Sequence, residues 1–445
     1  MRGDRKKQSL LMGCAKFRAI IMMSRVKVLR GGLLIDGTGA KPVKNCVVIV
    51  KDSKIAEVGV EGEIKIPEGD DVKVIDVYGK TIMPGLIDTH IHVCMDGEPR
   101  GLIERTINQN CMLAAIKGVS YLRRTLESGV TTAQDGGSGF NWMEVALRDA
   151  INQGFIEGPR YFTAGYHITV TGGHGYFFPP WLGSRSGGDI IEQAAMHADG
   201  PTEWRKAARL NLWYGVDVIK LVVSRDIISP GDPTSPQATI EEIRAAVEEA
   251  HKMGKKAMAH AVGRQAVLNA LEAGVDIIVH GFYIDDEIAD MMVEKGVYLM
   301  PTNRYVKLIV ERGEGEQPEY TVEGAKELWK DRRSNFKKYL EKGMKIVLGS
   351  DAGGVPYFRH GENAHELAVM VELGMSPSQA IVAATKLAAE CIGIEDKVGT
   401  IEPGKLADIL VVDGNPLEDI NTLTLKKNIY LVMKEGRIIK KREDE

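Results

Sequence analysis

Cysteine is scarce in this chain, which has five cysteines in 445 residues and no C-x-x-C pair. An odd number of widely spaced cysteines supports neither a disulfide framework nor a cysteine-ligated zinc site. Reduced thiols are typical of the cytosol, so we expect a cytoplasmic protein. The five residues are Cys14, Cys46, Cys94, Cys111 and Cys391.

Two further absences concern membranes and nucleic acids. The chain has no stretch of about 20 uncharged apolar residues, so no membrane span is expected. The 57 Lys and Arg residues are balanced by 61 Asp and Glu residues, and the net charge of −4 leaves no basic footprint for nucleic acid. We expect a small-molecule substrate and neither a nucleic-acid nor a membrane partner, and we leave open a homo-oligomer.

Residues 1–25 carry seven basic side chains against one acidic residue. Lys16 and Arg18 interrupt the place where a signal peptide needs an apolar core of about 7 to 15 residues. We expect a disordered basic tail, or a start codon placed too early, with Met22 or Met23 as the true first residue.

The length of 445 residues suits two or three domains of about 150 residues, or one barrel of about 250 with a smaller partner. Short strand-like runs separated by turn residues occur at both ends of the chain. They predict a small composite β-sandwich domain built from residues 26–83 and 399–445. Its predicted strands are 26–29, 46–50, 55–58, 72–77, 409–412 and 429–433.

Between these blocks, residues 84–398 alternate between strand-like and helix-like patterns. One amphipathic helix is predicted over 239–252, where Thr239 and Glu242 can form a capping box, and a second over 326–341. Eight strand–helix units of this kind predict an α/β fold, a TIM (β/α)8 barrel with insertions. The eight strands are predicted at 86–90, 130–134, 160–164, 216–222, 256–260, 276–280, 297–301 and 344–349.

The active site of a TIM barrel lies at the carboxyl ends of its strands, so polar residues there are candidates for chemistry. The first strand ends in an H-x-H pair, His90 and His92, whose imidazoles point to one side and can bind one metal ion. His260, His280 and Asp351 end the fifth, sixth and eighth strands. Each could serve a structural role alone, but a joint coincidence at one barrel face is hard to sustain.

The fourth strand carries a lysine, Lys220, inside an apolar run. A buried ammonium is costly unless it is paired or neutralised. The amine either reaches water or a carboxylate at the strand end, or it reacts with carbon dioxide. The resulting carbamate has two anionic oxygens that can bridge two metal ions.

Two motifs resemble the amidohydrolase superfamily. They are Met-Pro-Gly-Leu-Ile-Asp-Thr-His-Ile-His at 83–92 and Gly-Thr-Ile-Glu-Pro-Gly-Lys-Leu-Ala-Asp-Ile at 399–409. The resemblance implies a metal-dependent hydrolase with a barrel and a composite β-sandwich. Carried over by motif, the metal ligands are His90, His92, Lys220, His260, His280 and Asp351, and the catalytic residues are Lys220 and Asp351.

The resemblance also implies how the site works. The presence of Lys220, and the absence of a Glu close after His260, indicate the two-metal subtype with a carboxylated lysine. The expected cofactors are two divalent ions, zinc by the imidazole-rich donor set with manganese or cobalt as alternatives, and carbon dioxide as the carbamate. A metal-bridging hydroxide is expected to attack the scissile carbonyl, while Asp351 passes the proton to the leaving amine.

The overall spacing, and the stretch Thr-Gly-Gly-His-Gly at 171–175, resemble most the prolidase-like and imidazolonepropionase-related peptidases. These enzymes cleave Xaa-Pro or Xaa-Arg/Lys dipeptides. We therefore expect hydrolysis of a C–N amide bond in a dipeptide or an N-acyl amino acid. The alternatives are a cyclic amide, a carbamate or urea, or an organophosphate or lactone, and, in another class, a non-catalytic scaffold.

Long loops rich in Gly or Pro follow several strands, and the longest is predicted over 167–201. Loops of this size usually shape the substrate pocket. For each polar residue in them the alternative is a side chain that serves its own loop. The candidates are Tyr166, His167 and His174 to stabilise an oxyanion, and Arg225 and Arg304 to bind a substrate carboxylate.

Overall fold

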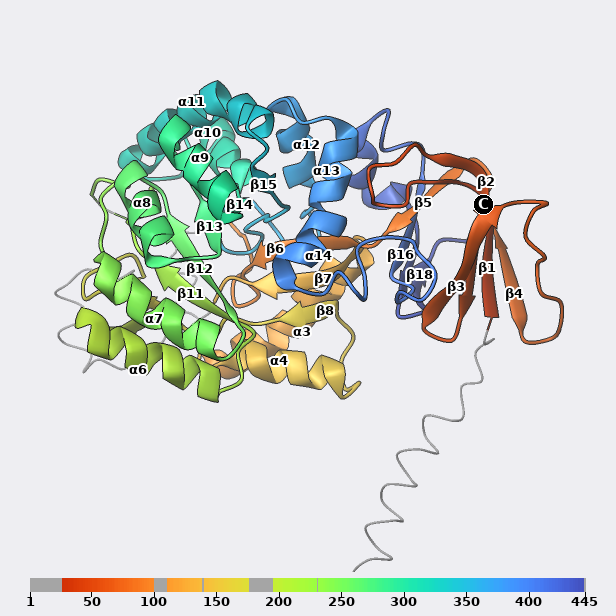
Figure 1. Ribbon diagram of the computed structural model, residues 1–445, viewed down its shortest axis with the longest axis horizontal. Coiled ribbons are helices and arrows are strands. Elements are labelled where there is room, and N and C mark those ends of the chain that lie inside the picture. The colour runs from red at the N-terminus through yellow and green to blue at the C-terminus, as the bar shows by residue number, and fades with distance from the viewer. Residues whose placement is uncertain (1–25, 100–109, 138–139, 176–194, 230, 444–445) are drawn as a thin grey trace, which may run out of the picture.

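The structure is a computed structural model that describes residues 26–99, 110–137, 140–175, 195–229 and 231–443 (Figure 1). The tail predicted over 1–25 lies outside these residues. Strands and helices alternate through the middle of the chain, which confirms the predicted α/β class. Figure 1 shows the sheet formed by the chain ends beside this larger, helix-covered part.

Strands from both ends of the chain form one eight-stranded sheet, in the order β18-β17-β16-β5-β1-β2-β3, with β4 paired to β1. Strand β16 runs antiparallel to β5 and places Ile409 opposite Pro84, so this pairing joins the two ends. The strands are β1 (Val26–Leu34), β2 (Val43–Lys51), β3 (Lys54–Val60), β4 (Val72–Asp76), β5 (Lys80–Pro84), β16 (Ile409–Asp413), β17 (Ile429–Lys434) and β18 (Arg437–Lys441).

Six of these strands lie where the sequence predicts them, whereas β5 and β18 are absent from the prediction. Strand β18 is mostly half-exposed and carries Arg437, Lys440 and Lys441, so it has little apolar pattern to detect. Strand β5 is almost fully buried and is followed, after Gly85 alone, by the next strand, so no turn separates the two.

Two parallel sheets make up the middle of the chain, one with the order β6-β7-β8 and the other with the order β10-β9-β11-β12-β13-β14-β15. All eight strands predicted for this part overlap with β6, β7, β8 and β11 to β15, although β15 is only two residues long. The loop predicted over 167–201 contains two short paired strands, β9 and β10, and its residues 176–194 lie outside the described part. The bounds are β6 (Leu86–Ile91), β7 (Val130–Asp135), β8 (Arg160–Phe162), β9 (His167–Thr169), β10 (Ala195–His197), β11 (Val218–Val222), β12 (Lys256–Ala261), β13 (Ile277–His280), β14 (Tyr298–Met300) and β15 (Lys345–Ile346).

Backbone hydrogen bonds connect the two parallel sheets at two places. The Asp217 N–H donates to Thr163 O over 2.7 Å, between the ends of β8 and β11. The Thr89 N–H donates to Leu348 O over 2.8 Å, between β6 and the segment after β15. The carboxyl ends of strands from both sheets therefore face a common region.

Helices lie around the outside of the parallel sheets, as Figure 1 shows for α6 to α11. The helix predicted over 239–252 is α7, whose Thr239 and Glu242 form the predicted capping box. The helix predicted over 326–341 begins earlier, at Glu319. The helices are α3 (Cys111–Glu127), α4 (Met143–Asn152), α6 (Gly200–Trp213), α7 (Ile240–Lys252), α8 (Arg264–Ala273), α9 (Asp286–Lys295), α10 (Asn303–Arg312), α11 (Glu319–Glu341), α12 (His365–Glu372), α13 (Pro377–Ala383) and α14 (Lys386–Ile392).

Within the described ranges, no helix is long and apolar enough to cross a lipid bilayer. The four cysteines that fall in these ranges form no disulfide with one another, in agreement with the sequence. They are Cys46, Cys94, Cys111 and Cys391.

The cap of α7 provides a test of the local structure. The Glu242 N–H donates to Thr239 Oγ1 over 3.2 Å, so Thr239→Ala leaves this N–H without its acceptor. We expect the free energy of unfolding, measured by urea denaturation, to fall by about 1 kcal/mol. Thr239→Ser keeps the hydroxyl and should remain near the wild type. Equal destabilisation by both substitutions would contradict the capping role.

Candidate active site

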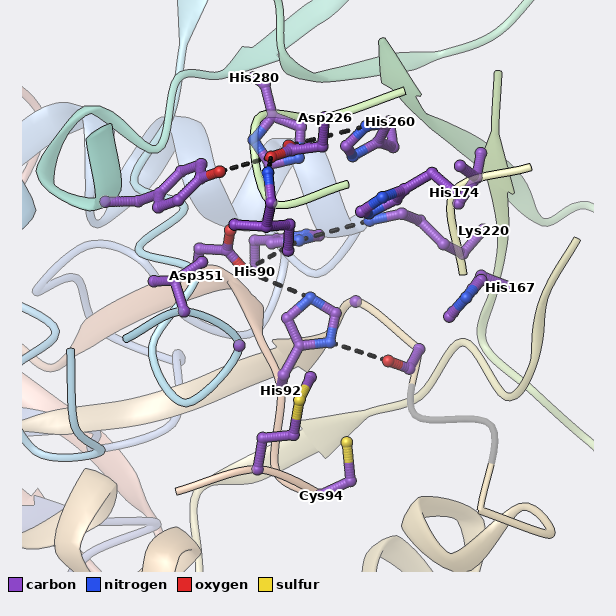
Figure 2. Close-up of a pocket in the computed structure, with 18 of the residues that line it drawn as sticks. His90, His92, Cys94, His167, His174, Lys220, Asp226, His260, His280 and Asp351 are labelled. Carbon is purple, nitrogen blue, oxygen red and sulfur yellow. Dashed lines mark hydrogen bonds and ion pairs between the residues drawn. The ribbon is translucent and has the colours of Figure 1, made fainter. Parts of the chain in front are cut away.

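The six predicted metal ligands line one pocket at the carboxyl ends of the parallel strands (Figure 2). Five of them have less than 5% of their surface exposed, and only His92 is half-buried. The structure thus brings together side chains that are up to 261 positions apart, from residue 90 to residue 351. They come from β6 (His90), the position after it (His92), β11 (Lys220), β12 (His260), β13 (His280) and the segment after β15 (Asp351).

One half of the site is formed by the H-x-H pair and the acid of the last strand. Asp351 Oδ1 lies 3.2 Å from His92 Nε2 and 3.7 Å from His90 Nε2. Lys220 Nζ lies 3.4 Å from the same His90 nitrogen. The ligand atoms of the two histidines and Asp351 lie within 4.8 Å of one another, a spacing that suits one metal ion.

The other half is formed by His260 and His280, whose ring centroids are 4.5 Å apart. Each ring has one nitrogen bound by the protein. His260 Nε2 donates to the backbone oxygen of Arg225 over 3.1 Å, and His280 Nδ1 is hydrogen-bonded to Thr302 Oγ1 at 2.8 Å. The opposite nitrogen of each ring, Nδ1 of His260 and Nε2 of His280, is left for a ligand.

This arrangement is typical of histidines that hold metal ions, because a bond to the second nitrogen fixes the ring and its tautomer. His92 follows the same rule, since its Nδ1 donates to Gly137 O over 2.8 Å and leaves Nε2 toward Asp351. Burial strongly lowers the pKa of His90 and His260, and it lowers the pKa of His280 to about 3. These three imidazoles are therefore neutral, the form that binds metal, at neutral pH, whereas the hydrogen bond with Asp351 raises the pKa of His92.

Two glycines keep the space beside the ligands clear. A Cβ at Gly136 would lie 2.7 Å from His90 Nε2, and a Cβ at Gly354 would lie 2.7 Å from Asp351 Oδ1. No side chain fits at either position without moving a ligand. The donor set, its tautomers and this clearance all fit divalent metal ions.

Asp88 connects β6 to the segment after β15, and these two segments carry the first half of the site. It is fully buried and accepts hydrogen bonds from the backbone N–H of His90 and of Ser350, from the Ser350 hydroxyl and from Asn363 Nδ2. Burial raises the pKa of Asp88 to about 6. The side chain thus fixes His90 and the neighbour of Asp351 relative to each other.

Two of the predicted ligands have a strained backbone. His280 and Asp351 both adopt left-handed conformations, with φ of 69° and 65°, which residues other than glycine rarely adopt. Arg332, fully buried on α11, donates from Nη2 to the carbonyl oxygen of His280 and lies 4.3 Å over the Phe282 ring. Arg332 therefore holds the strained turn that orients His280.

The residues predicted for substrate binding divide into two groups. His167 and His174 line the pocket, and the ring of His174 stacks on His260 with centroids 4.6 Å apart. His167 Nε2 is buried without a hydrogen bond to the described residues, so it remains available to a ligand. Arg225 contributes its backbone oxygen to His260, while its side chain is not part of the described pocket wall.

Two of the predictions do not fit the positions of the residues. The Tyr166 hydroxyl accepts a hydrogen bond from the Asn141 N–H, and its ring packs on Trp142 rather than lining the pocket. Arg304 also lies outside the pocket wall and pairs with Glu311 over 3.2 Å. Arg304 lies at the start of α10, and its side chain follows the surface of that helix. The prediction that Arg304 binds a substrate carboxylate in the pocket is therefore corrected.

The structure adds pocket residues that the prediction omits. Asp226, in the loop after β11, is 3% exposed and accepts a hydrogen bond from the Tyr305 hydroxyl. Both line the pocket, together with Cys94 and Phe140. In the sequence, Asp226 is an acidic residue four positions after a predicted strand and next to Arg225. A single acidic residue in a loop has no distinctive spacing, so the sequence did not identify it as a pocket residue.

Arg332 provides a test of how the site is held. Arg332→Met removes the guanidinium and leaves the buried His280 carbonyl without a donor, which should lower the free energy of unfolding by about 1–3 kcal/mol. The matched control is Arg333→Met, at the next residue of α11, which is exposed. This substitution should change the free energy of unfolding by less than about 0.5 kcal/mol. Urea denaturation measures both, and equal effects would refute the role assigned to Arg332.

Comparisons with known proteins agree with this geometry. The pattern of the amidohydrolase family matches residues 81–439. Ochratoxinase from Aspergillus niger is 31% identical over 446 residues, which cover 94% of this chain and 87% of that protein. An Xaa-Pro dipeptidase crystallised with methionine in its active site is 34% identical with a TM-score of 0.82, over 93% of this chain and 99% of that one.

A further similarity concerns another substrate class. Phenylurea hydrolase B is 25% identical with a TM-score of 0.77, over 93% of this chain and 96% of that one. The family match extends over most of the chain, and the pocket holds the residues expected to bind metal. The chain therefore belongs to the amidohydrolase family and is a metal-dependent hydrolase that acts on carbon–nitrogen bonds.

Proposed function

We propose that this hydrolase cleaves the amide bond of a dipeptide, of the Xaa-Pro or Xaa-Arg/Lys type, or of an N-acyl amino acid. The observation that carries the proposal is the presence of all six ligand residues in one pocket. The pocket wall also includes apolar side chains such as Phe140, Ile228 and Val355, which suit the hydrocarbon part of an acyl group. The similarity to an Xaa-Pro dipeptidase with bound methionine supports a substrate of this kind.

In this proposal the ligands hold two divalent ions, zinc or, with similar donors, manganese or cobalt. His90, His92 and Asp351 would hold one ion, His260 and His280 the other, and Lys220 would contribute to both. When bound, such ions supply a water nucleophile at neutral pH and polarise a carbonyl. The protein's own side chains carry out the other steps, which are the transfer of the proton and the binding of the substrate.

Lys220 is the residue that we assign to the bridge, as a carbamate. In the described part of the chain its amine has one hydrogen-bonding contact, with His90 Nε2, and burial lowers its pKa to about 8. About a tenth of the amine is therefore neutral at pH 7. The neutral amine forms an N–C bond with carbon dioxide and releases one proton, and the two carbamate oxygens are then anionic ligands.

Asp351 is the residue that we assign to proton transfer. Its carboxylate lies in the pocket beside His92, close to the place where the leaving nitrogen must stand if the nucleophile is held between the two halves of the site. A carboxylate there accepts the proton of the nucleophile and donates it to the leaving amine. His167, with its free buried Nε2, is positioned to contact a polar group of the substrate.

The same proposal includes the architecture predicted from the sequence. We propose that the two hydrogen-bonded parallel sheets form one closed TIM barrel over 84–398, and that 26–83 with 399–445 form the composite β domain. We further propose a cytoplasmic protein that acts on small molecules, without a nucleic-acid or membrane partner. A homo-oligomer is compatible with this function.

A substrate library tests the function directly. Dipeptides and N-acyl amino acids should be assayed with zinc and bicarbonate supplied, and we expect turnover of one of these groups. No turnover of any amide, together with cleavage of phenylureas, carbamates or lactones, would replace the proposal by the alternative. Fewer than one bound ion per chain and no hydrolysis after metal addition would indicate a scaffold.

Lys220→Ala tests the bridge. Loss of the amine removes the shared ligand. We therefore expect the protein to lose most of its bound metal and kcat to fall by at least about 100-fold. Metal analysis and steady-state kinetics measure the two effects. The control is Lys256→Ala, which removes a lysine from the neighbouring strand, where Nζ donates to the Glu390 and Cys391 carbonyls and lies 5.1 Å over the Tyr298 ring. A Lys220→Ala protein with two ions and full turnover would refute the carbamate.

A urea or carbamate substrate is the second candidate, and the similarity to phenylurea hydrolase B favours it. These substrates also present a carbonyl bonded to nitrogen, so the same residues would serve the same steps. They differ in that the group next to the carbonyl is a second heteroatom rather than a carbon. The library separates the two candidates by which class shows the higher kcat/KM.

A further inference from the structure

Asp226 is a second pocket carboxylate that the proposed reaction does not use. It lies in the loop after β11, is 3% exposed and points into the same pocket as the six ligands (Figure 2). Its Oδ1 accepts hydrogen bonds from the Tyr305 hydroxyl and, over 3.1 Å, from the Ile228 N–H. These contacts hold the carboxylate in a fixed orientation, with Oδ2 toward His260.

Tyr305 and Ile228 bind Oδ1 and the backbone of Ile227 also contacts the carboxylate, while Oδ2 is turned toward His260. The nearest ring nitrogen, His260 Nε2, is 3.8 Å away, and it already donates to Arg225 O over 3.1 Å. No lysine or arginine in the described part of the chain forms an ion pair with Asp226. Because a buried carboxylate is costly without a positive partner, Asp226 favours a cation in the pocket, either a metal ion or a cationic group of the substrate.

A metal ion is one candidate for that cation, since the ligand atoms of His174, Asp226 and His260 lie within 4.8 Å of one another. The two rings, however, are stacked with an interplanar angle of 16°. The lone pairs of an imidazole lie in the ring plane, so nearly parallel rings do not direct them at a common point. His174 Nδ1 is also bound to Ser229 Oγ over 2.7 Å.

An organic ammonium group fits better, because it needs only acceptor oxygens around it. In an aminoacyl substrate the ammonium stands one carbon from the scissile carbonyl, close to the metal ligands. Asp226 lies on the His260 side of the pocket, and Asp351, assigned to the leaving nitrogen, lies on the His92 side. The two carboxylates thus match the two nitrogens of a dipeptide.

We propose that Asp226 binds the α-ammonium group of the substrate and thereby selects dipeptides over N-acyl amino acids that lack it. This inference rests on the proposed amide hydrolysis and narrows its substrate class. It makes Asp226 a specificity-determining residue, with Tyr305 as the residue that positions it.

The test uses two substrates that differ only in the α-amino group, leucyl-proline and 4-methylpentanoyl-proline, with the metal-loaded protein. We expect the wild type to prefer leucyl-proline by about tenfold or more in kcat/KM, the scale of one charge-assisted hydrogen bond. Asp226→Asn should remove most of this preference by lowering kcat/KM for leucyl-proline. The value for the acyl compound should stay within about threefold of the wild type.

The matched control is Asp232→Asn in the same loop, where the exposed carboxylate bonds to Thr234. This variant should keep the wild-type preference. An equal loss for both substrates in Asp226→Asn, or a lower metal content, would instead assign Asp226 to holding the ligands and overturn the inference. A wild type without preference for the ammonium substrate would overturn it as well.

A binding measurement separates this inference from the proposed function. Calorimetry should show that leucine binds the loaded wild type more tightly than 4-methylpentanoate, and that Asp226→Asn loses this difference. If neither peptide is cleaved, the proposed function fails for these substrates, and the leucine result still decides the inference. Equal binding of the two compounds to the wild type would overturn it.

Discussion

A buried amine is the constraint on which the rest of the site depends. Lys220 is 3% exposed at the end of a parallel strand, and its Nζ lies 3.4 Å from the Nε2 of an equally buried histidine, His90. Burial disfavours charge on both groups, as the lowered pKa of each reflects. The proposed metal ions and carbamate would satisfy all these groups at once, since the imidazoles would bind as neutral donors and the lysine would become an anionic ligand.

The surrounding residues hold the predicted ligands in position and are not themselves proposed to bind the metal ions. Asp88 connects the backbone of His90 to that of Ser350, and Arg332 holds the carbonyl of His280 in a left-handed turn. Carbonyl oxygens of loop residues bind the remaining nitrogens of His92 and His260. Such contacts keep the donors in place before an ion binds, which lowers the reorganisation needed for catalysis.

The sequence was sufficient for the strands that carry the predicted ligands, and the structure brings those six side chains into one pocket. Strand alternation and the position of polar residues at strand ends are local signals, and the fold brings the ends together. Strand β18 was missed because its charged residues obscure the apolar pattern, and β5 because no turn separates it from β6. These failures are local as well.

Side chains outside the strands were harder to predict, because tertiary contacts decide their direction. Arg304 was expected in the pocket but pairs with Glu311 along its own helix. Asp226 was overlooked beside Arg225, and it is placed by Tyr305, which is 79 positions away in the chain. Only the folded chain shows which of two adjacent charged residues in a loop lines the pocket.

The account depends most directly on two ions joined by a modified lysine. Anomalous diffraction from crystals of the protein loaded with zinc and bicarbonate measures both. The predicted result is two peaks, one among His90, His92 and Asp351 and one between His260 and His280, with density for a carboxyl group on Lys220 Nζ. An unmodified lysine, or no anomalous peak at these residues, would contradict the account.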